Sequence, residues 1–286
     1  MSTAIQRSLN TISPGALTLG IRMVTLEECT HLSELITCVS GLKVNFERLT
    51  IHYSTIPELP AGHPLCDAPD TLAHWNQATD QVTLAADRVQ GYEESDDSRE
   101  FLIRLAILGQ QFRLPLDNFA LKMIVTHEIF HSAHYQVQPK PFEEAATHAL
   151  DPNDRKKRDK AKLSYVHTET VTHFATGEVA ARAFRDDRSY IADFRDLYGI
   201  LVDQSMGEFK KRGEEAFFLE CRRSNGTAEN AELRYSINSG LELMHHLKYK
   251  VFNNDSQRAI QWIIDRPATD LGEIQCWKRY LNRCRG

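Results

Sequence analysis

Apolar positions recur with strand-like spacing only in the early part of the chain, where one helical segment precedes them, and with helical spacing in the later part. Thr25 and Glu28 stand at the spacing of a capping box, and the apolar residues that follow them recur at helical intervals. Residues 42–54 are rich in apolar and β-branched positions and predict a strand. Alternation in residues 81–89 predicts a second strand, short and half-buried. Residues 56–80, between these strands, are dense in Pro, Asp and His and predict an irregular loop.

Helical spacing dominates the rest of the chain. Residues 99–112 predict a helix, and Asp117 is placed to cap a second helix that ends near Tyr135. A polar stretch over residues 136–160 then interrupts the pattern. From Leu163 onward the sequence predicts helices, with breaks near Gly177, Asp186, Gly226, Asn253 and Pro267. The pattern therefore predicts an α+β fold, with strands early and helices late.

The composition is ordinary for a globular protein, with 42% hydrophobic and 26% charged residues among 286. A formal net charge of -5 argues against nucleic acid as the main partner. Residues 155–162 form a basic run, but neighbouring aspartates dilute it, and we expect a solvated loop there. No window approaches the roughly 20 apolar residues of a membrane-spanning helix, so no membrane span is expected.

The beginning of the chain is rich in Ser and Thr and poor in acidic residues. Residues 1–22 therefore predict a flexible tail, and their composition is similar to that of the unstructured secretion signals of proteins that bacteria inject into host cells. We expect residues 23–286 to form a single domain, in which residues 191–286 make a helical C-terminal subdomain.

A candidate metal site lies in the second predicted helix, in the sequence IVTHEIFHSAH. His127 and His131 are four residues apart, so on a helix their imidazoles lie one turn apart on the same face and can reach one zinc ion. Glu128 follows the first histidine and is rotated away from the metal, where its carboxylate can take a proton from water. This is the HExxH pattern of zinc peptidases.

The flanking residues extend the pattern, because every position from Ile124 to Ala133 that the extended motif requires to be uncharged is uncharged. The chain here resembles the zincin metallopeptidases, which implies a zincin-like fold with a small N-terminal sheet, an HExxH helix and a largely helical C-terminal half. It departs from the metzincin branch, since the Gly and third His of that branch are replaced by His134 and Val137. The resemblance therefore implies one Zn²⁺ per chain, held by His127, His131 and a later glutamate.

Three positions are candidates for that glutamate. Glu169 is the first choice, since it lies on a predicted helix beyond the polar stretch, and His173 one turn later could orient a ligand from outside. Glu178 lies in a sequence that resembles the ligand helix of some glutamate zincins, but Gly177 predicts that it starts a new helix, where a glutamate can simply favour the helix dipole. The pair Glu143 and Glu144 is the third alternative.

Two further elements follow from the resemblance. Arg188 and Tyr190 occupy positions similar to those of the Arg and Tyr that stabilise the oxyanion in clostridial-neurotoxin-type proteases and in type III-secreted bacterial effector metallopeptidases. Residues 81–89 correspond to the edge strand to which zincins add the backbone of their substrate. Trp75, nearby in the sequence, can be a core residue.

These observations lead to the hypothesis of a zinc endopeptidase with Glu128 as general base. The resemblance implies an effector or toxin, secreted by a bacterium into the host cytoplasm, that cleaves a host protein such as a signalling protein. Two alternatives remain open: an interaction protein that keeps the fold without turnover, and a regulatory peptidase that cuts a repressor in the cytoplasm of its own cell.

Overall fold

The structure is a computed structural model, and it describes residues 11–19, 23–68, 71–93, 119–146, 155–186, 237, 240–241 and 243–266. The chain divides into two compact units, one of residues 1–136 with 176–197 and the other of residues 137–175 with 198–286. The single domain expected over residues 23–286 stays a prediction. Among the described residues, no helix is long and apolar enough to cross a membrane.

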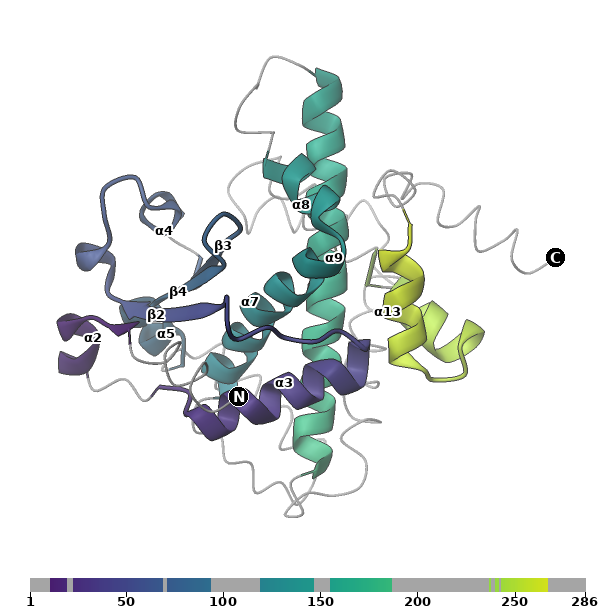
Figure 1. Ribbon diagram of the computed structural model, residues 1–286, viewed down its shortest axis with the longest axis horizontal. Helices are drawn as coiled ribbons and strands as arrows, with labels where there is room; N and C mark the ends of the chain where they lie inside the picture. Colours follow the sequence, from purple (N-terminus) through teal and green to yellow (C-terminus); the bar gives the residue numbers. More distant parts are fainter. Residues whose placement is uncertain are drawn as a thin grey trace, which may run out of the picture. The chain divides into compact units, whose positions relative to one another are not determined.

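The first unit contains a four-stranded mixed sheet in the order β1-β2-β4-β3 (Figure 1). Its strands are β1 (Thr11–Ile12), β2 (Thr50–Ser54), β3 (Ala73–Asn76) and β4 (Gln81–Ala85). Strands β1, β2 and β4 are parallel, whereas β3 pairs antiparallel with β4. A small sheet near the N-terminus of a mostly helical chain confirms the predicted α+β class.

The strand predicted over residues 42–54 is correct only in its last five residues. Asn45 ends the extended conformation before that point, because its carbonyl accepts the N–H groups of Arg48 and Leu49 and its side chain accepts that of Glu47. A side-chain oxygen that bonds backbone two residues ahead makes a turn, and the turn competes with the ladder. The apolar pattern therefore continues through a segment that is not a strand.

Part of the predicted flexible tail belongs to the sheet. β1 pairs with β2, and the short helix α2 (Pro14–Thr18) follows it, capped by Ser13. The Glu58 carboxylate, at the end of the 3₁₀ helix η1 (Ile56–Glu58), accepts the Ser13 hydroxyl and, at 2.6 Å, the Gly15 N–H. These donors, together with Thr55, lower the pKa of Glu58 to about 2. Residues 11–19 are ordered by long-range partners that composition cannot reveal.

The loop predicted over residues 56–80 is wrong in three places. It contains η1, the helix α4 (Pro64–Asp67) and the strand β3. β3 has only four residues, and it exists because Ala73 and Trp75 are buried in register opposite Leu84 and Val82 of β4. Its strand character comes from this pairing, so local composition predicted it poorly.

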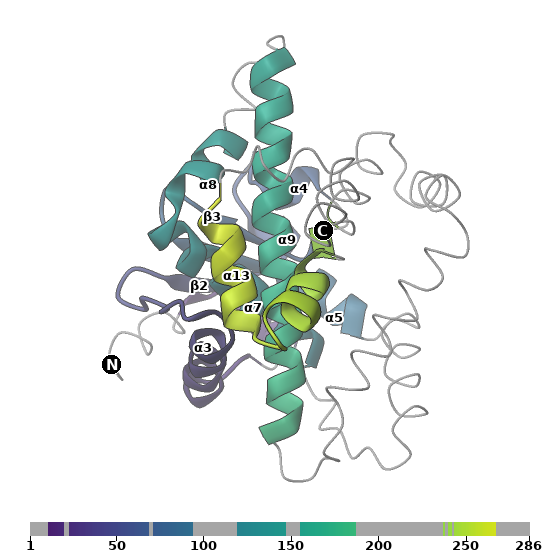
Figure 2. The ribbon, with the colours of Figure 1, turned by 90° about the vertical axis from the view of Figure 1, so that its right-hand side faces the viewer.

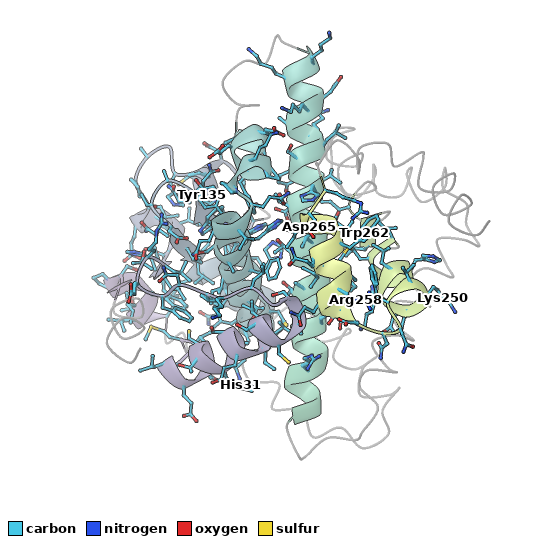
Figure 3. The ribbon with its side chains drawn as sticks, turned by 45° about the vertical axis from the view of Figure 1, so that its right-hand side comes forward. His31, Tyr135, Lys250, Arg258, Trp262 and Asp265 are labelled. Carbon is cyan, nitrogen blue, oxygen red and sulfur yellow. The ribbon has the colours of Figure 1, made fainter. Side chains whose placement is uncertain are left out.

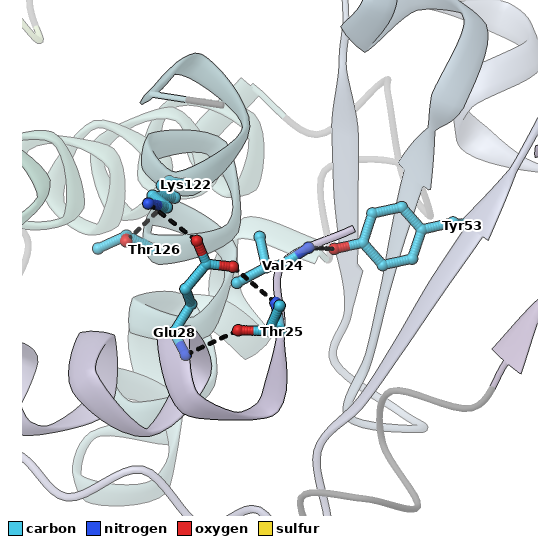
Figure 4. A network of polar contacts seen from close by, with 6 residues as sticks. All are labelled: Val24, Thr25, Glu28, Tyr53, Lys122 and Thr126. Atoms are coloured by element: carbon cyan, nitrogen blue, oxygen red, sulfur yellow. Dashed lines mark hydrogen bonds and ion pairs between the residues drawn. The ribbon is translucent and has the colours of Figure 1, made fainter. Parts of the chain in front are cut away.

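Two long helices of the first unit pack together beside the sheet: α3 (Leu26–Ser40) and α7 (Phe119–Val137). The capping box that starts α3 is confirmed, with the Thr25 N–H donating to Glu28 at 2.8 Å. The other carboxylate oxygen of Glu28 lies 2.9 Å from Lys122 Nζ and joins the two helices (Figure 4). Nearby, the Val24 N–H donates to the Tyr53 hydroxyl of β2 at 3.4 Å. α3 turns its polar face, with His31, to solvent (Figure 3).

β4 leads directly into α5 (Ala86–Glu93), and the later helices are α8 (Pro139–Ala146), α9 (Arg155–Asp186) and α13 (Ser256–Ile264). The described parts of the polar stretch over residues 136–160 are thus largely helical, and the basic run begins α9 with exposed lysines instead of forming a loop. The predicted break at Gly177 is wrong, because α9 continues through it. A helix tolerates one internal glycine at a cost of about 1 kcal/mol, which packing can offset.

The break predicted near Asn253 is confirmed. The π-helical segment η3 (Leu247–Val251) ends there, Asn253 and Asn254 adopt positive φ angles of 48° and 69°, and Asp255 caps α13. Asparagine is among the few residues that adopt this conformation readily. α13 and η3 pack side by side in the second unit (Figure 2). The side chains of Lys250 and Arg258 point outward from them (Figure 3).

Candidate metal centre

The two histidines of the HExxH pattern lie on α7. The helix forms around a buried apolar stripe of fully covered side chains: Val125, Ile129, Phe130 and Ala133. This burial confirms that the uncharged flanks face the interior. His131 is 7% exposed, and His127 is partly buried. The motif therefore lies on a helix that buried apolar side chains anchor in the first unit.

The geometry of the two imidazoles suits one metal ion. Their Nε2 atoms are 3.1 Å apart, and their rings are nearly perpendicular, at 86°, with centroids 4.7 Å apart. Two nitrogens bound to a tetrahedral zinc at about 2.0–2.1 Å should lie about 3.3 Å from each other. The observed separation of His127 and His131 is close to that value. Without metal, one imidazole can donate a hydrogen bond to the other.

Glu128 lies on the same turn but points away from the histidine pair, because successive residues of a helix are rotated by about 100°. Glu128 is 9% exposed, whereas most of the other glutamates that the structure describes are exposed or half-buried. A carboxylate that is costly to bury is commonly found where it serves chemistry. Glu128 is thus a largely buried carboxylate that adjoins His127 on α7.

The predicted third ligand, Glu169, lies on α9 with His173 one turn later. The Nε2 atom of His173 is 3.6 Å from a carboxylate oxygen of Glu169, and the Glu169 side chain is 14% exposed. Glu169 and His173 are therefore the pair of possible metal ligands that α9 offers within the second unit. His127 and His131 are the corresponding pair on α7 within the first unit.

The other candidate glutamates differ in their surroundings. Glu144 accepts the Ser164 hydroxyl at 2.9 Å and pairs with Lys160 at 2.8 Å. Burial raises the pKa of Glu144, but Lys160 and Ser164 together hold it below its ordinary value. This carboxylate is therefore engaged elsewhere, while its neighbour Glu143 is exposed.

Glu178 is 5% exposed and lies inside α9. The expectation that it begins a helix is therefore wrong, and so is the explanation of it as a residue that favours the dipole of a helix N-terminus. Arg188 and Tyr190 lie outside the described residues. Their role in binding an oxyanion stays a prediction.

The assignment of residues 81–89 as an edge strand is wrong. β4 is paired on both sides, with β2 and with β3, and the last four of its five residues are buried. The antiparallel edge of the sheet is β3 instead. Its Trp75 stacks on His131, with ring centroids 6.1 Å apart and planes 19° from parallel. The sequence predicted Trp75 only as a core residue. Its position in a histidine-rich segment was the one signal that could have pointed to a contact with the candidate metal site.

In comparisons with known proteins, no family model, no curated protein and no solved structure matches the chain. The resemblance to zincins therefore rests on the HExxH residues and their flanks. What the site can do must be argued from its own side chains.

Proposed function

We propose that the protein is a zinc-dependent endopeptidase that hydrolyses peptide bonds of a protein substrate. The observation that carries this proposal is the approach of His127 Nε2 and His131 Nε2 to 3.1 Å on a helix that also bears the buried Glu128. The arrangement combines a pair of zinc ligands with a sheltered carboxylate, which is what metal-assisted hydrolysis needs.

The ligands that we assign to one zinc ion are His127, His131 and Glu169. Two imidazole nitrogens and a carboxylate oxygen are ligands that zinc prefers, and three of them leave the fourth tetrahedral position for water or substrate. Glu169 supports this assignment by its partial burial, since its side chain is 14% exposed. His173 has the role of orienting the Glu169 carboxylate, which lies 3.6 Å from its Nε2 atom.

When bound by these residues, a zinc ion would supply a Lewis acid for the scissile carbonyl and would make a water molecule more acidic. Glu128 accepts the proton of that water as the water oxygen attacks the carbonyl carbon. It then delivers the proton to the nitrogen of the leaving amine as the C–N bond breaks. Arg188 and Tyr190 are the proposed donors to the oxyanion.

The first test is metal content, measured on purified protein by inductively coupled plasma mass spectrometry. We expect about one zinc ion per chain. His127→Ala and Glu169→Ala should lose it, whereas Glu143→Gln, a change at an exposed glutamate, should keep it. Zinc that persists in Glu169→Ala but is lost in Glu178→Gln would move the third ligand to Glu178. A wild-type chain that binds no zinc after reconstitution would overturn the proposal.

The second test is peptidase activity on a proteome-derived peptide library, with the products identified by mass spectrometry. Glu128→Gln preserves the size of the side chain and should preserve zinc, but removal of a general base should lower the rate about 10²–10⁴-fold. Unchanged cleavage in this variant would mean that the activity does not come from this site.

A second candidate function is an interaction protein in which a metal ion only stabilises the fold. The observation that favours it is His173, whose Nε2 atom lies 3.6 Å from the Glu169 carboxylate and would add a fourth ligand to His127, His131 and Glu169. Four protein ligands close a zinc site and are typical of structural sites. In that case His173→Ala would lose zinc, and Glu128→Gln would leave the biological activity unchanged.

We propose that the endopeptidase is delivered by a bacterium into a host cell. Its substrate there is an intracellular host protein. This part rests on the likeness of the N-terminal composition to secretion signals and of the HExxH region to effector peptidases. The alternative is a regulatory peptidase that cleaves a repressor of its own cell. Incubation of the active protein and of Glu128→Gln with host lysate and with lysate of the producing cell separates the two.

A further inference from the structure

The edge strand β3 places an indole against the helix of the metal site. Trp75 is 8% exposed, and its ring lies nearly parallel to that of His131 at a centroid distance of 6.1 Å. The same indole contacts the ring of Tyr135, one turn further along α7, at 5.4 Å and 59°. Offset stacking and tilted packing at these separations are favourable aromatic geometries. Trp75 thus covers the turn of α7 that begins with the second histidine.

Asp80 holds the indole in this orientation. The Trp75 Nε1–H donates to Asp80 Oδ1 at 2.8 Å, and Asp80 is only 6% exposed. Asp80 is itself fixed, since its φ is 52° and its carbonyl accepts the Thr50 N–H of β2 at 3.0 Å. The turn between β3 and β4 forms locally, because the Asn76 side chain accepts the N–H groups of residues 78 and 79. A buried carboxylate would lose its N–H donor if the indole rotated, so the rotation is unfavourable.

We propose that Trp75, fixed by Asp80, is a positioning residue that holds the His131 imidazole in its metal-binding orientation. The inference rests on the proposed function, in which His131 is a zinc ligand. A ligand imidazole must be prevented from turning about its Cβ–Cγ bond, and either a hydrogen bond to its outer nitrogen or a flat neighbour against its face does this. The stacked indole is such a neighbour. It keeps Nε2 of His131 directed toward Nε2 of His127.

The test measures the zinc dissociation constant by competition with a chelating dye, together with the visible absorption of the Co²⁺-substituted protein. Trp75→Leu removes the flat ring, and Asp80→Ala removes the acceptor that fixes it. Each should weaken zinc binding about 10-fold, the lower end of what outer partners of zinc ligands contribute. Each should also shift the Co²⁺ bands, which report ligand geometry. Asp80→Asn keeps an acceptor and a residue that tolerates positive φ, and should restore both values.

A control separates positioning from stability. Leu65 is fully buried in α4, so Leu65→Ala should destabilise the same unit while leaving zinc affinity and the Co²⁺ bands unchanged. Zinc binding by Trp75→Leu and Asp80→Ala as tight as that of the wild type would overturn the inference and leave the zinc site standing. If Trp75→Leu does not fold, Asp80→Ala alone decides. Wild-type protein that binds no zinc would overturn the proposed function and the inference with it.

Discussion

Replacing Glu28 should loosen the contact between α3 and the helix that carries the HExxH motif. One carboxylate oxygen of Glu28 closes the capping box with Thr25, and the other lies 2.9 Å from Lys122 Nζ on α7. Both groups are sheltered, with side chains 19% and 30% exposed. Glu28→Gln keeps an acceptor for the capping box but removes the charge, so it isolates the contribution of the ion pair.

The magnitude follows from these contacts. Exposed ion pairs contribute about 0.2–1 kcal/mol, and partial burial with good geometry places the pair of Glu28 and Lys122 near the upper end, at about 1 kcal/mol. Glu28→Ala also removes the capping interaction, which adds about 1 kcal/mol. We therefore expect the free energy of unfolding to fall by about 1 kcal/mol in Glu28→Gln and by about 2 kcal/mol in Glu28→Ala.

The same pair predicts a pH dependence. Burial raises the pKa of Glu28, but the Thr25 N–H and the Lys122 ammonium lower it more, so the pKa in the folded protein lies below its ordinary value of 4.5. A carboxyl group whose pKa is lowered by folding contributes stability above the pKa of the unfolded chain. This contribution is lost as the pH falls through the lower value in the folded protein.

Urea unfolding followed by circular dichroism measures both effects. A double-mutant cycle with Glu28→Gln and Lys122→Met should give a coupling of about 1 kcal/mol at neutral pH and low salt, reduced at high salt. The coupling should vanish in acid. A coupling within error of zero at neutral pH, or identical pH profiles of wild type and Glu28→Gln, would refute the reasoning.

Three further outcomes are expected. His173→Ala should raise the zinc dissociation constant about 10-fold without abolishing binding, because His173 orients Glu169; complete loss of zinc by mass spectrometry would make His173 a ligand. Burial, with a smaller contribution from a nearby lysine, lowers the pKa of His245 from 6.5 to about 4, so the unfolded chain binds a proton in this range that the fold excludes. The wild type should therefore lose about 3 kcal/mol of stability through His245 as the pH falls from about 6.5 to 4, and His245→Phe should not show this loss. Urea unfolding in which the variant keeps the pH slope of the wild type would contradict this. A Cβ at Gly240 would lie 2.5 Å from Thr170 Oγ1, on a stiff β-branched side chain. Gly240→Ala should lower the free energy of unfolding by about 1–3 kcal/mol, Thr170→Ala should recover part of it, and a double-mutant cycle without recovery would exclude the contact as the cause.

The parts of the fold that the sequence predicted are those set by neighbours along the chain. The capping box of α3 needs only residues three apart, and the HExxH helix needs only a regular apolar stripe around its histidines. The spacing of His127 and His131 alone placed both on one face of a helix, since that face follows from 3.6 residues per turn. The turn at Asn253 was likewise a local property of asparagine.

Tertiary structure decided what depends on partners distant in the chain. β3 is a strand because Ala73 and Trp75 pair with β4, and β4 became a central strand for the same reason. Glycine at position 177 interrupts nothing, because the packing of α9 outweighs a local preference of about 1 kcal/mol. The stacking of Trp75 on His131 joins residues on a strand and on a helix far along the chain. The sequence determined which atoms could bind a metal ion, and only the fold decided which side chains lie against them, because those contacts join residues distant in the chain.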